Sequence, residues 1–309
     1  MLKREAPLRV AFLILCGAAL ALFLGRFPWR DVPAVLARGS LVILGAAVAV
    51  NLGSIAAKGT AWYFLLRSAA PCRWWAAQEA NLLGAGMNTV SVTVMGETAR
   101  VQDLAVRERL SVGTVAASVV RTRAVEALAL ACFMLLAPAV LTLPPLLHSL
   151  QITGGGLVAA LVAVAWSGKR VRLLELLPTK VRVVLTSITE TGSARTFLLA
   201  LLFGLLNWIA LWASYQLVLS AFDIRVPLAA SFTALILTNL GGLFRLSPGN
   251  VGITQAAMIV SLLPFGVRPP EGLAVGLALQ AVQVLPVLAL ALLLFGGRQV
   301  AARMARQAG

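Results

Sequence analysis

The sequence is poor in charged residues, which argues against a water-soluble domain. Lys, Arg, Asp and Glu together make up 12% of the 309 residues, whereas a soluble domain usually contains about 25%. Hydrophobic residues account for 60%, and the mean hydropathy is +0.92. Because so apolar a chain cannot cover a water-facing surface with polar groups, lipid is its natural solvent. The composition predicts an all-α polytopic membrane protein.

Residues that form disulfides, metal sites and common catalytic centres are also scarce. Cys16, Cys72 and Cys132 are widely spaced and form no C-x-x-C pair, so neither a disulfide framework nor a zinc site is indicated. The single histidine, His148, lies in a loop, and no H-E-x-x-H or G-x-S-x-G element is present. We therefore expect no metal, no cofactor and no enzymatic activity. An intramembrane enzyme that uses Glu97 as a base stays an open alternative.

Basic residues are in excess, and a net charge of +15 would also fit a nucleic-acid binder. The Lys and Arg residues occur, however, in short clusters between long apolar runs. That distribution is typical of orientation signals and of contacts with anionic headgroups. We therefore expect membrane lipids as partners and no nucleic acid.

Apolar runs long enough to cross a bilayer, about 20 residues, divide the chain. They cover residues 8–25, 40–66, 112–140, 152–168, 196–221 and 271–295. Two further stretches, 76–96 and 228–266, are interrupted by polar residues, Gly and Pro, as discontinuous or re-entrant helices are. We expect six to eight transmembrane helices with two broken or re-entrant segments. The sequences of residues 95–99 and 251–256, one in each half of the chain, are similar, so a weak inverted repeat is a further possibility.

The distribution of basic residues predicts the orientation. With the N-terminus in the cytoplasm, eighteen Lys and Arg residues fall inside, Lys58 among them, and five fall outside. The basic stretch 169–195 indicates a cytoplasmic linker between the halves 1–168 and 196–309 of a single transmembrane domain, 1–309. Both termini are expected in the cytoplasm.

Tryptophans lie near the ends of the predicted spans or in loops. They are Trp29, Trp62, Trp74, Trp75, Trp166 and Trp208. This placement is typical of an aromatic belt at the membrane interface, and it indicates anchoring.

Charged residues at membrane depth mark candidate sites, because a charge at the bilayer centre costs at least about 2.5 kcal/mol and persists only when paired or hydrated. Glu97 and Arg100 are three residues apart, as are Arg123 and Glu126, and this spacing allows pairing on one helix face. Arg121 has no partner nearby in sequence and would reach a lipid phosphate or Glu97. The alternatives are an ordinary helix start at Glu97 and arginines that extend to the headgroups.

A third place surrounds Arg245. Pro248 prevents an uninterrupted helix, and Gly249 and Gly252 permit tight backbone geometry. Backbone groups freed beside Arg245 would suit an anionic group such as a phosphate. A plain cytoplasmic turn between two short spans is the alternative.

These residues resemble those of a known family, the flippase-like membrane proteins related to the transmembrane region of lysylphosphatidylglycerol synthase. A G-E-x-x-R element stands at residues 96–100, and a small-S-V-V-x-x-R-x-x-D/E element at 117–126. The family's P-G-G-L-G-V-x-E-A element corresponds to residues 248–256. The three elements occur in the family's order over roughly residues 80–260. The resemblance implies a protein of the bacterial inner membrane.

The chain departs from the family pattern at several positions. Val92 and Thr93 replace the usual Pro-Gly, Asn250 replaces a glycine, and Gln255 replaces the acid of the last element. Loss of that carboxylate weakens a role in cation or proton handling. The family's lipid-modifying enzymes add a soluble aminoacyl-transfer domain after the membrane region, and we expect no such activity here.

The leading hypothesis is a lipid flippase, transporter or lipid-binding protein for an anionic or isoprenoid-type lipid. The substrate class is implied by the resemblance. The alternative is a scaffold or accessory subunit that binds lipid-biosynthesis enzymes. The candidate lipid-binding residues are Asn88, Glu97, Arg100, Arg121, Arg123, Glu126, Asn239, Arg245 and Gln255, and the candidate backbone breaks are Gly96, Pro248, Gly249 and Gly252.

Overall fold

A computed structural model describes residues 28–91, 95–139, 141–142, 149, 152, 193–242 and 248–308. Within these ranges the chain folds into helices and has no strand, which confirms the all-α class. The predicted span 8–25, and nearly all of the span 152–168 and of the linker 169–195, lie outside these ranges.

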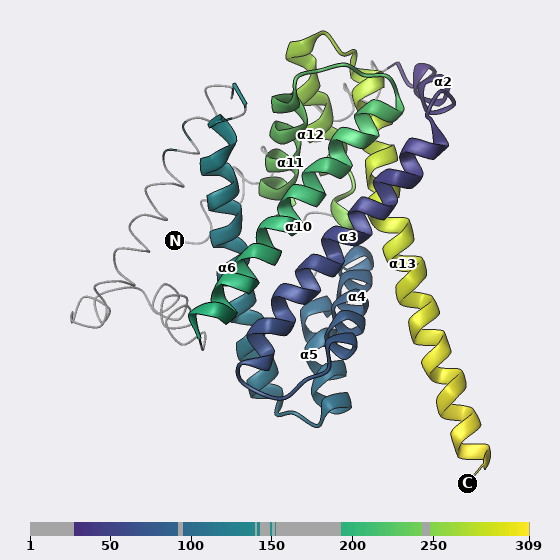
Figure 1. Cartoon of the computed structure of the whole chain (residues 1–309). Helices are drawn as coiled ribbons and strands as arrows, with labels where there is room; N and C mark the ends of the chain where they lie inside the picture. The colour runs from purple at the N-terminus through teal and green to yellow at the C-terminus, as the bar shows by residue number, and fades with distance from the viewer. Residues whose placement is uncertain are drawn as a thin grey trace, which may run out of the picture.

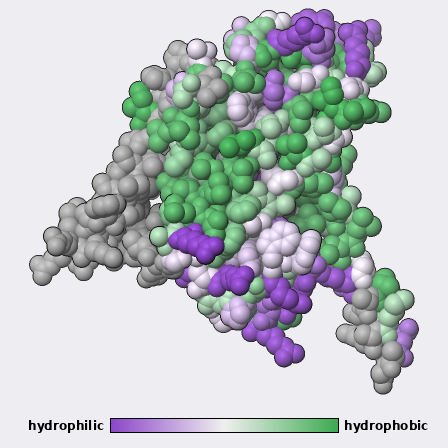
Figure 2. Space-filling view, viewed as in Figure 1, coloured by the Kyte–Doolittle hydropathy of each residue, from purple (hydrophilic) through white to green (hydrophobic). Residues whose placement is uncertain are grey.

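Membrane-length helices match three of the predicted spans. In the described part of the chain they are α3 (Leu41–Arg67), α10 (Ala194–Ala221) and α13 (Pro269–Ala308, apolar to Val300). Apolar side chains on these helices face outward, and that of Leu293 is 72% exposed. Hydrophobic residues cover the middle of the face in Figure 2, and hydrophilic residues gather at its two ends. The protein is therefore a multi-pass membrane protein.

Two further helices flank this set. The helix α6 (Val112–Leu136) occupies the predicted span 112–140 and is followed by the 3-10 turn η1 (Ala137–Ala139). Its N-terminus is capped by Ser111, whose side chain accepts a hydrogen bond from the backbone of Thr114. Although α6 is long, the three charged residues in its middle set it apart from α3, α10 and α13, whose apolar windows contain fewer charges. The short α2 (Asp31–Leu36) packs against the start of α13.

The irregular stretch 76–96 forms most of a helical hairpin, called the first hairpin below. It consists of α4 (Trp74–Val90) and α5 (Met95–Glu108). The backbone N–H of Arg73 donates to the Glu108 carboxylate at 3.1 Å, so the start of α4 and the end of α5 lie together. At 17 residues, α4 is about 25 Å long, which is shorter than the hydrocarbon core. The hairpin therefore starts and ends on one side of the molecule, as a re-entrant segment does (Figure 1).

The stretch 228–266 forms the second hairpin. It consists of α11 (Leu228–Gly242), η2 (Pro248–Asn250), α12 (Ile253–Leu262) and η3 (Leu263–Phe265). Gly249 and Gly252 have φ angles of +61° and +87°, which strongly favour glycine, and this agrees with the predicted break. Gly96 behaves differently: it lies inside α5, against α4. A Cβ atom on Gly84 of α4 would lie 2.7 Å from the Gly96 carbonyl oxygen, so Gly96 marks a close helix crossing.

The two hairpins enter from opposite ends and meet at their tips (Figure 1). A Cβ atom on Gly249 would lie 3.2 Å from the Thr89 carbonyl oxygen, so the tip of the second hairpin contacts that of the first. Each half of the described chain thus has the order long helix, hairpin, long helix. This is the order that an inverted repeat produces, and the repeat itself stays a prediction.

Candidate functional site

A cavity of about 370 Å³ lies beside the two hairpins, between α3, α6, α10 and α13. It includes six of the nine side chains that the sequence marks as lipid-binding candidates: Asn88, Glu97, Arg100, Arg123, Glu126 and Asn239. The sequence elements around residues 97, 123 and 239 therefore converge on one place, although they are far apart in the chain.

Arg123 connects the two acidic residues of the cavity. Its guanidinium donates to Glu97 of α5 and, at 2.8 Å, to Glu126 of its own helix. Glu97 also forms an ion pair with Arg100 at 2.5 Å. Both predicted i,i+3 pairs are therefore present, and Arg123, rather than Arg121, joins them across helices.

Lys58 completes the cluster and was not among the predicted site residues. Its ammonium group lies 3.2 Å from the Glu126 carboxylate. The distribution of basic residues predicts that Lys58 is an orienting charge, but Lys58 lies inside α3, nine residues before the helix ends. Three cations, Lys58, Arg100 and Arg123, thus face two carboxylates in the cavity. The cluster carries one net positive charge when all five groups are ionised.

Arg100 is held deep in the protein, with 2% of the residue exposed. Its guanidinium carbon lies 4.8 Å from the centroid of the Trp62 ring, a distance typical of a cation–π contact. Trp62 is fully buried, and its indole N–H donates to Ser118 at 2.9 Å. The expectation that Trp62 anchors at the membrane interface is therefore wrong. Instead, its ring forms part of the wall that fixes Arg100.

Five buried polar atoms of the cavity's side chains lack a hydrogen-bond partner among the described residues. Three of them belong to the ion pairs of Glu97 with Arg100 and of Glu126 with Lys58. The Nε atom of Arg100 and the Oδ1 atom of Asn88 are in neither a hydrogen bond nor an ion pair. An unpaired buried donor or acceptor costs about 1–3 kcal/mol. One free donor and one free acceptor in a common cavity are what a polar ligand or water would satisfy.

Two of the remaining three candidates, Arg121 and Gln255, do not line this cavity. Arg121 is two residues from Arg123 and does not line it, since that offset turns a side chain to the other side of a helix. Gln255 is buried elsewhere, where its amide binds Gln280 and the backbone of Gly252. Arg245 lies outside the described residues.

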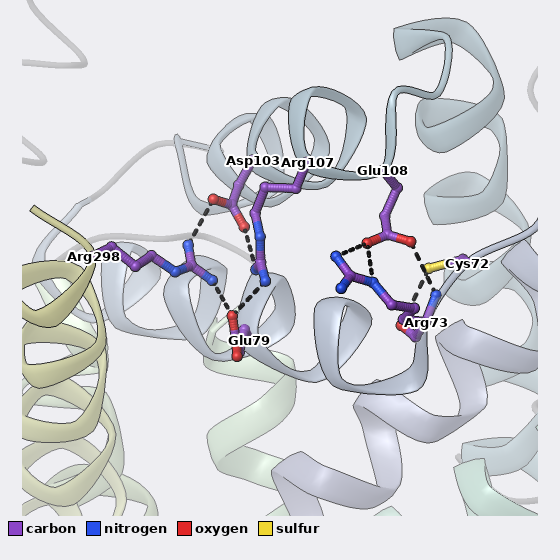
Figure 3. Close-up of polar contacts among 7 residues, drawn as sticks. All are labelled: Cys72, Arg73, Glu79, Asp103, Arg107, Glu108 and Arg298. Atoms are coloured by element: carbon purple, nitrogen blue, oxygen red, sulfur yellow. Dashed lines mark hydrogen bonds and ion pairs between the residues drawn. The ribbon is translucent and has the colours of Figure 1, made fainter. Parts of the chain in front are cut away.

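A second ionic network fixes the open end of the first hairpin to α13 (Figure 3). Arg298 of α13 donates to Glu79 of α4 at 2.5 Å and to Asp103 of α5 at 2.7 Å. Arg107 of α5 also pairs with Glu79, at 2.7 Å. The network therefore joins three helices at the end of the first hairpin opposite its tip.

No group of three or more His, Cys, Asp or Glu residues in the described part of the chain could hold a metal ion. The comparison with curated proteins gives no match. A family model described as the lysylphosphatidylglycerol synthase TM region matches residues 8–291, which include all three sequence elements and the whole described cavity. The chain therefore belongs to the family of the lysylphosphatidylglycerol synthase transmembrane region.

Proposed function

We propose that the protein binds an anionic or isoprenoid-type lipid of the bacterial inner membrane and moves its headgroup through the cavity. Family membership supports a membrane protein that takes part in lipid-related envelope processes. The charge of the cavity supports an anionic ligand. The proposal contains no covalent step, so the protein acts as a transporter or lipid-binding protein and not as an enzyme.

The observation that carries the proposal is the net positive charge of a cavity inside a helix bundle. Lys58, Arg100 and Arg123 outnumber Glu97 and Glu126 by one charge. An uncompensated charge is costly where the dielectric constant is low, and an anionic ligand reduces that cost. A phosphate group is the matching ligand, because guanidinium groups bind phosphate through strong charge-assisted hydrogen bonds.

Within this proposal the arginines have different roles. The Arg123 side chain is 44% exposed and that of Arg100 is 3% exposed, so Arg123 lies nearer the cavity mouth. An entering headgroup would meet Arg123 first and compete with a carboxylate for it. The unpaired Nε atom of Arg100 would donate to a headgroup that had moved further in. Glu97 and Glu126 would hold the cations in place between transport events.

A lipid-transfer assay tests the proposal. The purified protein is reconstituted into liposomes with a trace of fluorescent phosphatidylglycerol, and a membrane-impermeant quencher reports the exchange between leaflets. We expect Arg123→Ala to lower the protein-dependent exchange rate at least tenfold, since it removes hydrogen bonds to a charged group worth roughly 1.5–3 kcal/mol. Arg123→Lys keeps the charge but not the planar guanidinium group. Its exchange rate is expected to lie between those of the wild type and Arg123→Ala.

Arg121→Ala is the matched control, because it removes an arginine from the same helix but not from the cavity. It is expected to exchange lipid at the wild-type rate. Wild-type exchange by a folded Arg123→Ala protein would contradict the proposal and favour the scaffold alternative. The melting temperature of each variant shows whether a lost rate reflects lost structure.

A further inference from the structure

A second pocket, of about 410 Å³, lies between the end of α3 and the start of α10. It is lined by Phe64, Arg67, Ser68, Arg195, Thr196 and Leu199. None of these residues lines the central cavity. The two helix ends lie near the lower side of the molecule in Figure 1, away from the level of the hairpin tips.

The rim of this pocket is cationic, and no acidic residue is among its described lining residues. Arg67 donates to the hydroxyl group of Tyr63, and its guanidinium carbon lies 5.7 Å from the Tyr63 ring centroid. This contact orients Arg67 without cancelling its charge. Neither Arg67 nor Arg195 forms an ion pair with a described carboxylate, whereas the nearby Arg73 is paired with Glu108. Two guanidinium groups that no described carboxylate neutralises are a match for a phosphate.

The rest of the pocket is partly apolar. The Phe64 ring lies 5.7 Å from that of Phe203 and packs against the cluster of Leu65, Val125 and Ala200. Leu199 adds a second apolar side chain, one turn after Arg195. The two hydroxyl groups of the lining form local hydrogen bonds: Ser68 donates to the Leu65 carbonyl, and the Thr196 hydroxyl bonds that of Ser193.

From this combination we infer a binding site for an anionic phospholipid, separate from the transport cavity. The phosphate contacts Arg67 and Arg195, and the upper part of an acyl chain lies along Phe64 and Leu199. The first turn of α10 contributes its positive helix end to the same phosphate. A free phosphate would satisfy the arginines but leave the apolar surface uncovered, so the amphiphile is the better match. The lipid would bridge α3 and α10, two helices that pack closely together.

Native mass spectrometry of the purified full chain tests the inference, because it counts bound lipids one by one. The protein is titrated with a short-chain phosphatidylglycerol, with phosphatidylcholine of the same chain length, and with phosphatidylglycerol plus inorganic phosphate. We expect the double variant Arg67→Gln, Arg195→Gln to hold one phosphatidylglycerol fewer than the wild type. Each single variant is expected to weaken that binding step about tenfold.

The matched control is Arg109→Gln, an exposed arginine directly after α5 that does not line the pocket. It should keep the wild-type number of lipids. Three results would overturn the inference: an unchanged count in the double variant, an equal loss in Arg109→Gln, or equal binding of phosphatidylcholine. Displacement by equimolar inorganic phosphate would overturn the amphiphile in favour of a free anion. Because lipids are counted, the result does not depend on whether the central cavity transports lipid.

Discussion

Gln255 of α12 donates from its side-chain amide to the side-chain oxygen of Gln280 on α13, at 2.6 Å. Gln280 in turn donates to the Gly249 carbonyl at 2.7 Å, and the backbone N–H of Gly252 donates to Gln255 at 2.7 Å. The tip of the second hairpin is therefore attached to α13 through two amide side chains. The family resemblance places a carboxylic acid at position 255. An amide suits this relay because, unlike a carboxylate, it both accepts and donates.

Gln280→Ala is expected to destabilise the protein by about 1–2 kcal/mol, because it removes the donor to the Gly249 carbonyl and the nearer acceptor of the Gln255 amide. The measurement is the thermal unfolding temperature of the purified variant in detergent. Gln307→Ala, at an exposed position near the end of the same helix, is the control and should unfold like the wild type. An unchanged unfolding temperature in Gln280→Ala would show that the hydrogen bonds of Gln280 do not stabilise the tip of the second hairpin.

The sequence predicts the parts of the site that depend on local spacing. Glu97 and Arg100, and Arg123 and Glu126, are each three residues apart, and the structure pairs each of them. The break near Pro248 was likewise visible, because proline cannot continue a helix. The sequence does not reveal that Arg123 would reach Glu97, since that contact depends on how α5 packs against α6.

Lys58 and Trp62 show the same limit. Both lie near the end of an apolar span, where a lysine usually orients the chain and a tryptophan usually meets the headgroups. The structure instead pairs Lys58 with Glu126 and buries Trp62 under Arg100. Each partner is more than 35 residues away in the chain, so neither helical spacing nor hydropathy could identify it.

The glycine at the crossing of the first hairpin leads to a second prediction. A Cβ atom on Gly84 would lie 2.7 Å from the Gly96 carbonyl oxygen, which is backbone and cannot rotate away. We therefore expect Gly84→Ala to lower the free energy of unfolding by about 1–3 kcal/mol. Gly45→Ala on α3 is the control, because no heavy atom lies within 4 Å of its Cβ position. There the better helix propensity of alanine should raise stability by up to about 1 kcal/mol. Equal effects in the two variants would contradict close packing at Gly84.

The pair of Arg73 and Glu108 makes stability depend on pH at the open end of the first hairpin (Figure 3). Burial of the Glu108 carboxyl acts to raise its pKa, but the hydrogen bonds and charge of Arg73 outweigh it and hold the pKa below the ordinary 4.5. The folded state therefore binds this proton less readily than the unfolded state does. The stabilisation is fully present above pH 4.5 and is lost as the pH falls through the lowered pKa.

Glu108→Gln should remove this contribution, so we expect its unfolding temperature to lie below that of the wild type at pH 7 and to approach it at pH 3. Arg73→Gln should behave in the same way, because it removes the other partner.

The Cys72 thiol provides an independent measurement: burial and then the charge of Glu108 raise its pKa to about 11. In a chain with Cys16 and Cys132 replaced by serine, Glu108→Gln should lower that pKa and speed maleimide labelling of Cys72 at pH 8, since the thiolate is the reactive form. Labelling at the wild-type rate would show that the Glu108 charge does not reach the thiol.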